Sequence, residues 1–190
     1  MAPEFFESVT FTNGGMVYKH SQPRIAQMIF VTPWVGRQFA RLIMRVDPTY
    51  SFMRAQLRAL WSDNPEFPIN ATQRDEDIDA MVSFMRWNAT ARVWSDTISY
   101  LTDRLRFEAR WHPAIRALGR TIVTNRLRCG FVWGDADRVA PVQIAVTLSD
   151  DLNRGACQLR IVGGRGHFPH LEAPDQWVAN VALIAHGKHA

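Results

Sequence analysis

Two residues near the C-terminus have side chains and surroundings suited to acid–base catalysis. Asp137 follows an apolar run, within residues 134–141 (GDADRVAP), and His167 follows the next apolar run, within residues 166–174 (GHFPHLEAP). A histidine can take up and release a proton near neutral pH. A buried carboxylate beside it orients the ring and stabilises the imidazolium ion that forms. The two segments therefore predict the base half of a hydrolytic triad, with Asp137 as the acid and His167 as the base.

Neighbouring residues leave other interpretations of these segments open. The sequence around Asp137 is rich in turn-forming residues, so its carboxylate could serve a turn, and Asp135 competes for the role of the acid. A histidine in the position of His167 could also be purely structural. We expect His170 to be structural and Glu172 to order the loop or cap the closing helix. The two motifs, in this order, favour the catalytic interpretation.

The nucleophile is the part of a triad that the sequence lacks. A nucleophilic serine is usually presented on a sharp strand-to-helix turn flanked by glycines. None of Ser8, Ser21, Ser51 and Ser149 has such surroundings, and the glycine-rich residues 163–166 contain no nucleophile. We therefore assign no nucleophile in this chain.

The composition is that of a folded globular chain. Of the 190 residues, 47% are hydrophobic and 21% charged, which suffices for one core of ordinary size. The formal net charge is +4, and nearly all basic residues are arginines spread along the chain. We interpret them as a solvated surface. Because no nucleic-acid-binding motif is present, we expect no nucleic-acid partner.

The cysteines and the N-terminal sequence bear on the cellular compartment of the protein. Cys129 and Cys157 each flank an apolar run, which favours buried free thiols over a disulfide. The N-terminus lacks the basic start of a secretory signal, and no apolar stretch approaches the ~20 residues that span a bilayer. We therefore expect a cytoplasmic protein with no membrane partner.

Alternation of strands and helices predicts a parallel α/β sheet. Alternating β-branched residues predict a strand at 8–12, which Asn13, Gly14 and Gly15 end. The later elements are expected to be short apolar strands at 129–133 and 158–162 and helices at 142–148 and 173–185, the last opened by Pro174.

Between residues 24 and 120 the apolar residues recur at helical spacing. The sequence from Thr72 to Asp75 resembles a helix-capping motif and is expected to open a helix that contains Ile78. Further helices are expected at 91–105 and 107–118, with a proline that bends the second helix or marks its first turn.

Residues 134–141 and 166–174 resemble the acid and histidine motifs of α/β-hydrolases. The match is closest to the branch that includes haloalkane dehalogenases, epoxide hydrolases and mesoderm-specific-transcript-like proteins. Residues 9–16 resemble the sixth strand of that fold and its exit into the cap. The resemblance implies the C-terminal portion of an α/β-hydrolase parallel sheet in residues 1–20 and 121–190, with the first strands absent. It also implies a helical cap insertion in residues 21–120.

By the same resemblance, Asp137 is the triad acid, His167 is the base, and the nucleophile lies upstream. No metal and no organic cofactor are needed. In that family the cap roofs the pocket, so its tryptophans imply a small apolar substrate, although from the residues alone a helical core with bulky side chains is the favoured interpretation. An ester, an epoxide and a haloalkane all stay open, because the nucleophile would decide between them. The tryptophans concerned are Trp34, Trp61, Trp87, Trp94 and Trp111.

A non-catalytic interpretation stays open beside the hydrolase. Without the first strands, the strand at 8–12 would be an unpaired edge, and such edges invite pairing with another chain. The chain would then be a truncated hydrolase homologue or an interaction module. Its partner would be a second copy of itself or a missing N-terminal half.

Overall fold

The computed structural model describes residues 6–13, 50–87, 112–153 and 157–186, together with positions 35, 38, 42, 46, 47, 102, 103, 106 and 107. The chain divides into two compact units. The first combines Met1–Ser21, Trp61–Pro68 and Ala109–Ala190, and the second combines Gln22–Leu60 and Ile69–Glu108. Of the residues 21–120 expected to form the cap, Ser21, Trp61–Pro68 and residues 109–120 belong to the first unit. The role of the second unit as a cap stays a prediction.

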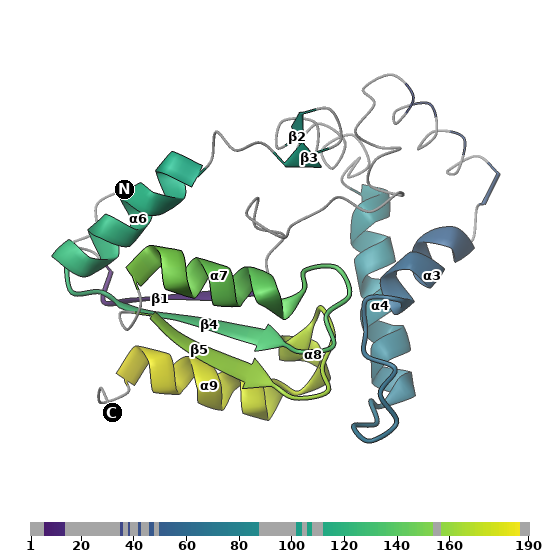
Figure 1. The fold of residues 1–190 in the computed structure, drawn as a ribbon. Helices are drawn as coiled ribbons and strands as arrows, with labels where there is room; N and C mark the ends of the chain where they lie inside the picture. Colours follow the sequence, from purple (N-terminus) through teal and green to yellow (C-terminus); the bar gives the residue numbers. More distant parts are fainter. Residues whose placement is uncertain are drawn as a thin grey trace. The chain divides into compact units, whose positions relative to one another are not determined.

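A three-stranded parallel sheet organises the first unit (Figure 1). Gly134, the last residue of one strand, pairs with Val162, the last residue of the next, so these two strands end side by side. The expected parallel α/β sheet is confirmed. In spatial order the strands are β1 (Ser8–Thr12), β4 (Arg128–Gly134) and β5 (Cys157–Val162).

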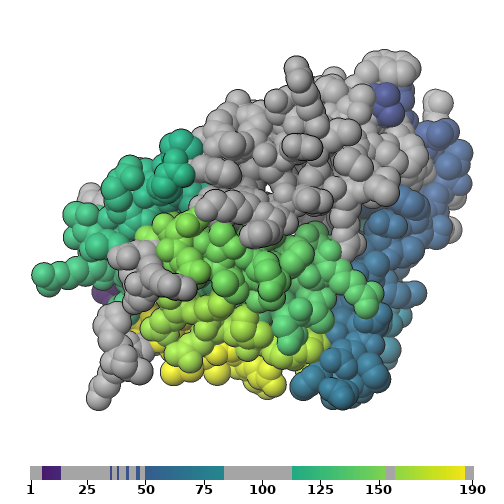
Figure 2. Space-filling model, viewed as in Figure 1, coloured from purple at the N-terminus to yellow at the C-terminus, as the bar shows by residue number. Residues whose placement is uncertain are grey.

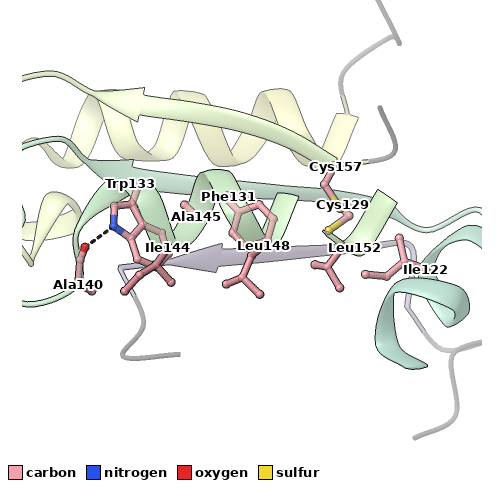
Figure 3. Packing of buried hydrophobic residues seen from close by; sticks show 10 residues of the cluster. All are labelled: Ile122, Cys129, Phe131, Trp133, Ala140, Ile144, Ala145, Leu148, Leu152 and Cys157. Carbon is pink, nitrogen blue, oxygen red and sulfur yellow. Dashed lines mark hydrogen bonds between the residues drawn. The ribbon is translucent and has the colours of Figure 1, made fainter. Parts of the chain in front are cut away.

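One face of this sheet is covered by α7 (Val142–Asn153), with α6 (His112–Thr124) packed against α7 (Figure 1). The outer face of α7, in green in Figure 2, is at the surface. On its inner face, Ile144 contributes to a buried apolar cluster with Phe131 and Trp133 of β4 (Figure 3). Burial of these large side chains holds the helix on the sheet.

The opposite face of the sheet packs against α9 (Pro174–His186), which follows the short helix α8 (Pro169–Glu172). Val132 and Val162 form a second apolar cluster with Ile184 of α9. The alternation along β4 explains the two clusters, because successive side chains of a strand point to opposite faces. Proline opens α9 at its first residue, as the sequence predicted.

The two cysteines lie opposite each other on β4 and β5, at the end of the cluster far from Trp133 (Figure 3). Both are free and buried, as predicted. A hydrogen bond between the thiols raises the pKa of Cys129, and burial adds to this, whereas the same bond lowers the pKa of Cys157. Cys157 is the more exposed of the two, which makes it the better position for the thiolate charge.

We expect the substitution Cys129→Ala to slow the alkylation of Cys157 severalfold at neutral pH. Without the thiol donor, the pKa of Cys157 rises towards its ordinary value, so less of the reactive thiolate is present. The rate can be followed with iodoacetamide and mass spectrometry. The control is Cys129→Ser, whose hydroxyl keeps a donor at this position. Equal rates in the wild type and the alanine variant would show that the thiol pair does not set this pKa.

Helices α3 (Ser51–Arg58) and α4 (Ala71–Trp87) pack together in the second unit. Arg58 Nη2 lies 2.9 Å from Asp75 Oδ1, and this hydrogen bond lowers the pKa of that exposed carboxyl group. The cap of α4 is Asn70, whose Oδ1 accepts the N–H groups of Thr72 and Gln73 at 3.1 and 3.2 Å. The predicted cap at Thr72 is therefore wrong by two residues, because asparagine is an equally good N-cap one position before the first helical residue.

Strands replace helix in the later part of the second unit. β2 (Thr102–Asp103) pairs with β3 (Arg106–Phe107) in antiparallel fashion. The helices predicted at 91–105 and 107–118 are wrong at these positions. Helix α6 begins only at His112, with Pro113 in its first turn.

Several other expectations fall outside the described residues. They concern the rest of the helix predicted at 91–105, Gly14, Gly15, Trp34, Trp94 and Trp111. None of the helices in the described part of the chain combines the length and apolar sequence needed to cross a membrane.

Candidate active site

The loops that follow β4 and β5 meet at the carboxyl edge of the sheet, and each carries one of the predicted residues. His167 Nδ1 lies 2.8 Å from Asp137 Oδ2. The side chain of Asp137 is fully buried, whereas that of His167 retains 18% exposure. The edge of a parallel sheet where the strands end is where ligands and reactive groups gather in open α/β folds.

Both oxygens of the Asp137 carboxylate face hydrogen-bond donors. Its Oδ1 accepts the N–H groups of Val139 and Ala140, at 2.7 and 2.9 Å. Its Oδ2 accepts the side-chain N–H of Asn13 at 2.6 Å and faces the ring of His167. Because an ionised carboxylate only accepts, we assign the ring proton of neutral His167 to Nδ1. This leaves the lone pair of Nε2 free to take a proton.

Asp137 thus has both of the roles that the sequence left as alternatives: it closes a turn and it contacts the histidine. Its Oδ1 closes the turn after β4, and its Oδ2 meets the histidine. Trp133 closes the same loop, because its Nε1 donates to the carbonyl of Ala140 at 2.7 Å (Figure 3). The competitor Asp135 has another function: its Oδ1 accepts the N–H of Gly164 at 2.6 Å and ties the two loops together.

A second buried carboxylate, Glu172, orders the histidine loop. Its Oε2 accepts the N–H of Gly166 at 2.8 Å, and its Oε1 accepts the N–H of Phe168 at 3.2 Å. The amides on both sides of His167 are therefore held by one side chain. Of the two roles expected for Glu172, the ordering of the loop is the one observed.

Trp61–Pro68 also contributes to this edge of the first unit, although two prolines are the main local sign of it in the sequence. The ring of Trp61 lies 4.6 Å from that of Phe168, measured between centroids. Ser62 donates its N–H to Glu172 Oε2 at 3.1 Å. Arg165 Nη1 donates to the carbonyl of Phe67 at 3.0 Å. The segment therefore contacts the histidine loop at both of its ends.

Of the serines considered from the sequence, Ser8 and Ser149 lie away from His167, and Ser51 belongs to the other unit. Ser8 opens β1, at the end of the sheet opposite to the site, and the hydroxyl of Ser149 donates to the carbonyl of Cys157, the first residue of β5. Ser51 opens α3 in the second unit. Across the described residues, Asp137 is the one side chain that hydrogen bonds to His167, so Nε2 has no nucleophile beside it there.

The described part of the chain also offers no group of three or more histidine, cysteine, aspartate or glutamate side chains arranged to hold a metal ion. The contact between His167 and buried Asp137 makes this site an oriented proton acceptor beside a buried anion.

A parallel α/β sheet with an acid–histidine pair at its carboxyl edge is the arrangement of the α/β-hydrolase class. The chain is 30% identical over 172 residues to the Mycobacterium tuberculosis protein named "Putative hydrolase LipZ", in strains CDC 1551 / Oshkosh and ATCC 25618 / H37Rv. The match covers 90% of this chain and 52% of LipZ, so the chain spans about half the length of these relatives. No family model matches the chain.

Two solved structures share the fold. One is a 2-hydroxy-6-oxo-6-phenylhexa-2,4-dienoate hydrolase (BphD) from Rhodococcus sp. strain RHA1, with a TM-score of 0.61 and 16% identity over 96% of this chain and 56% of that chain. The other is MGS-M2, an α/β hydrolase enzyme from a Medee basin deep-sea metagenome library, with a TM-score of 0.52 and 13% identity over 96% of this chain and 57% of that chain. The chain therefore has the fold of the α/β hydrolases and is similar in sequence to a putative hydrolase, in agreement with the resemblance of its two motifs.

We expect the substitution Gly134→Ala to destabilise the first unit by about 1–3 kcal/mol, the usual cost of overpacking. A Cβ at Gly134 would overlap the carbonyl oxygens of Arg165 and Gly166, which are backbone atoms of the histidine loop. The loop must therefore shift away from Gly134. Urea denaturation measures the free energy of unfolding.

The matched control for this substitution is Gly163→Ala, in the turn after β5. A Cβ there meets nothing within 4 Å. Equal stability of the two variants would contradict the close approach of the two loops at Gly134.

Proposed function

We propose that this chain contributes the acid and the base of an α/β-hydrolase-type hydrolase. Asp137 orients the ring of His167 and stabilises the imidazolium ion, while Nε2 of His167 takes a proton from a nucleophile or from the attacking water. The observation that carries the proposal is the 2.8 Å contact between Asp137 Oδ2 and His167 Nδ1. The burial of this carboxylate adds support, since exclusion of water strengthens its effect on the ring.

We propose a substrate that is a small apolar ester, epoxide or haloalkane. A serine nucleophile would form an acyl-enzyme from an ester, and water activated by His167 would then release the acid. An aspartate nucleophile would open an epoxide or displace a halide and form an alkyl ester, which the same activated water would hydrolyse. Both routes use His167 as a base and need no metal or organic cofactor.

We propose further that the nucleophile comes from a strand beside β1. In the described sheet, β1 lies at an edge, and all five of its residues are half-buried. A parallel strand added there would bring its carboxyl end to the same edge as Asp137 and His167. Such a strand would come from a missing N-terminal half or from a second copy of the chain. The match covers 52% of LipZ, so that relative has further sequence outside the match, which supports a source outside this chain.

The test uses the full chain, alone and mixed with a polypeptide that corresponds to the part of LipZ that the chain does not match. Hydrolysis of p-nitrophenyl esters, a small epoxide and a haloalkane is measured. Where turnover is found, we expect His167→Ala and Asp137→Asn each to lower kcat/KM by about 10²- to 10⁴-fold, the usual contribution of a general base and its orientation.

The matched control is His186→Ala, at the exposed end of α9, which should leave turnover unchanged. Turnover that survives the loss of His167 would overturn the proposed mechanism. No turnover of any of these substrates, in either arrangement, would instead favour the non-catalytic interaction module.

A further inference from the structure

We infer that Asn13 is a positioning residue for the Asp137–His167 pair, an inference that rests on the proposed function. Asn13 follows the last residue of β1 and is buried. Its side-chain nitrogen donates to Asp137 Oδ2 at 2.6 Å and to the carbonyl of Gly166 at 3.1 Å. Its side-chain oxygen accepts the N–H of Gly134 at 3.0 Å. One amide therefore connects the end of β1 with the end of β4 and with the loops that follow β4 and β5.

These three contacts fix the orientation of the amide. The backbone N–H of Gly134 can only donate, so it selects the oxygen of Asn13, and the carbonyl of Gly166 can only accept, so it selects the nitrogen. A flipped amide would lose all three bonds and place its oxygen against the carboxylate. The donor that faces Asp137 is thus determined by backbone groups rather than by the carboxylate itself.

The position of Asn13 acts on both members of the pair. Its bond to Oδ2 occupies one acceptor site of the oxygen that His167 also contacts, which leaves the remaining site for the ring. Its bond to Gly166 holds the residue directly before His167. The same side chain therefore holds both the acid and the loop of the base. A rotation of Asp137 away from the ring would break its 2.6 Å hydrogen bond with Asn13.

The backbone of Asn13 suggests a simpler role that has to be separated from this one. Its φ of 28° lies in the left-handed region, which asparagine tolerates better than most residues. If conformation alone required asparagine, glycine would serve as well or better. If the amide positions the pair, glycine would keep the backbone and lose the effect.

The experiment measures the Nδ1–H signal of His167 by NMR in the full chain labelled with ¹⁵N-histidine, with His167→Gln used to assign the signal. We expect a slowly exchanging Nδ1–H in the wild type. In Asn13→Gly we expect solvent exchange to be roughly tenfold faster, the effect of losing one hydrogen bond of ordinary strength. We also expect the ring nitrogens to shift towards a mixture of tautomers.

The matched control is Thr12→Val, one residue earlier. It removes the bond from Trp177 Nε1 to Thr12 Oγ1, 3.2 Å long, at the same strand end but without a link to Asp137. We expect its His167 signal to match the wild type. If Asn13→Gly fails to fold, as judged by circular dichroism, Asn13→Ser replaces it, because the shorter serine side chain cannot span the same three groups. A folded variant whose His167 signal equals that of the wild type overturns the inference.

The NMR result is independent of turnover. Absence of hydrolysis together with a perturbed His167 signal in Asn13→Gly would reject the proposed function and retain the positioning role. Where turnover is present, we expect Asn13→Gly to lower kcat more than it raises KM, because the amide contacts the pair and not a substrate. An unchanged kcat would count against the inference.

Discussion

The buried charge of Asp137 is the constraint on which this edge of the molecule depends. A carboxylate without exposure loses the solvation of water, at a cost of several kcal/mol that only close donors can offset. The donors come from three places: the turn that follows Asp137, Asn13 at the end of β1, and His167 after β5. The positions of the loops are therefore consequences of satisfying one anion.

Two buried carboxylates hold different parts of the histidine and its loop. Asp137 contacts the ring of the histidine, while Glu172 contacts the backbone on both sides of it. Hydrogen bonds to an ionised group contribute about 1.5–3 kcal/mol each, which is more than neutral pairs contribute. A loop held by such bonds at both flanking amides has little freedom to carry the ring away from Asp137. Because the ring is already held beside its carboxylate, no conformational entropy has to be lost to bring the two together before a proton is transferred.

The sequence allowed the sheet and the pair of loops to be predicted because both follow from local patterns. The apolar runs of β4 and β5 and the glycines and acids that end them are visible in a short window. The role of Asn13 was missed, because an asparagine before two glycines looks like a simple strand terminator. Its importance comes from groups more than a hundred residues away, which no local pattern contains.

The segment Trp61–Pro68 was missed for the same reason, and it shows how long-range contacts override local pattern. Its neighbours on both sides are helical, so its apolar and aromatic residues read as parts of helices. Pro65 and Pro68 were the available signal that the chain leaves the helical path there. The N-cap of α4 was predicted two residues too late, because Asn70 and Thr72 are both good N-cap residues. The structure distinguishes them, since Asn70 accepts the N–H groups of Thr72 and Gln73.

One oxygen of Glu172 couples the segment Trp61–Pro68 to the histidine loop. Oε2 accepts N–H groups from both Ser62 and Gly166, so the segment Trp61–Pro68 and the histidine loop cannot move independently without exposing an unsatisfied buried anion. Every partner of Asp137 and Glu172 named here lies in the first compact unit. The acid–base pair is therefore ordered by one unit of the chain. Under the proposed function, a nucleophile therefore has to match only the position of Nε2 of His167, because the rest of the site is already ordered.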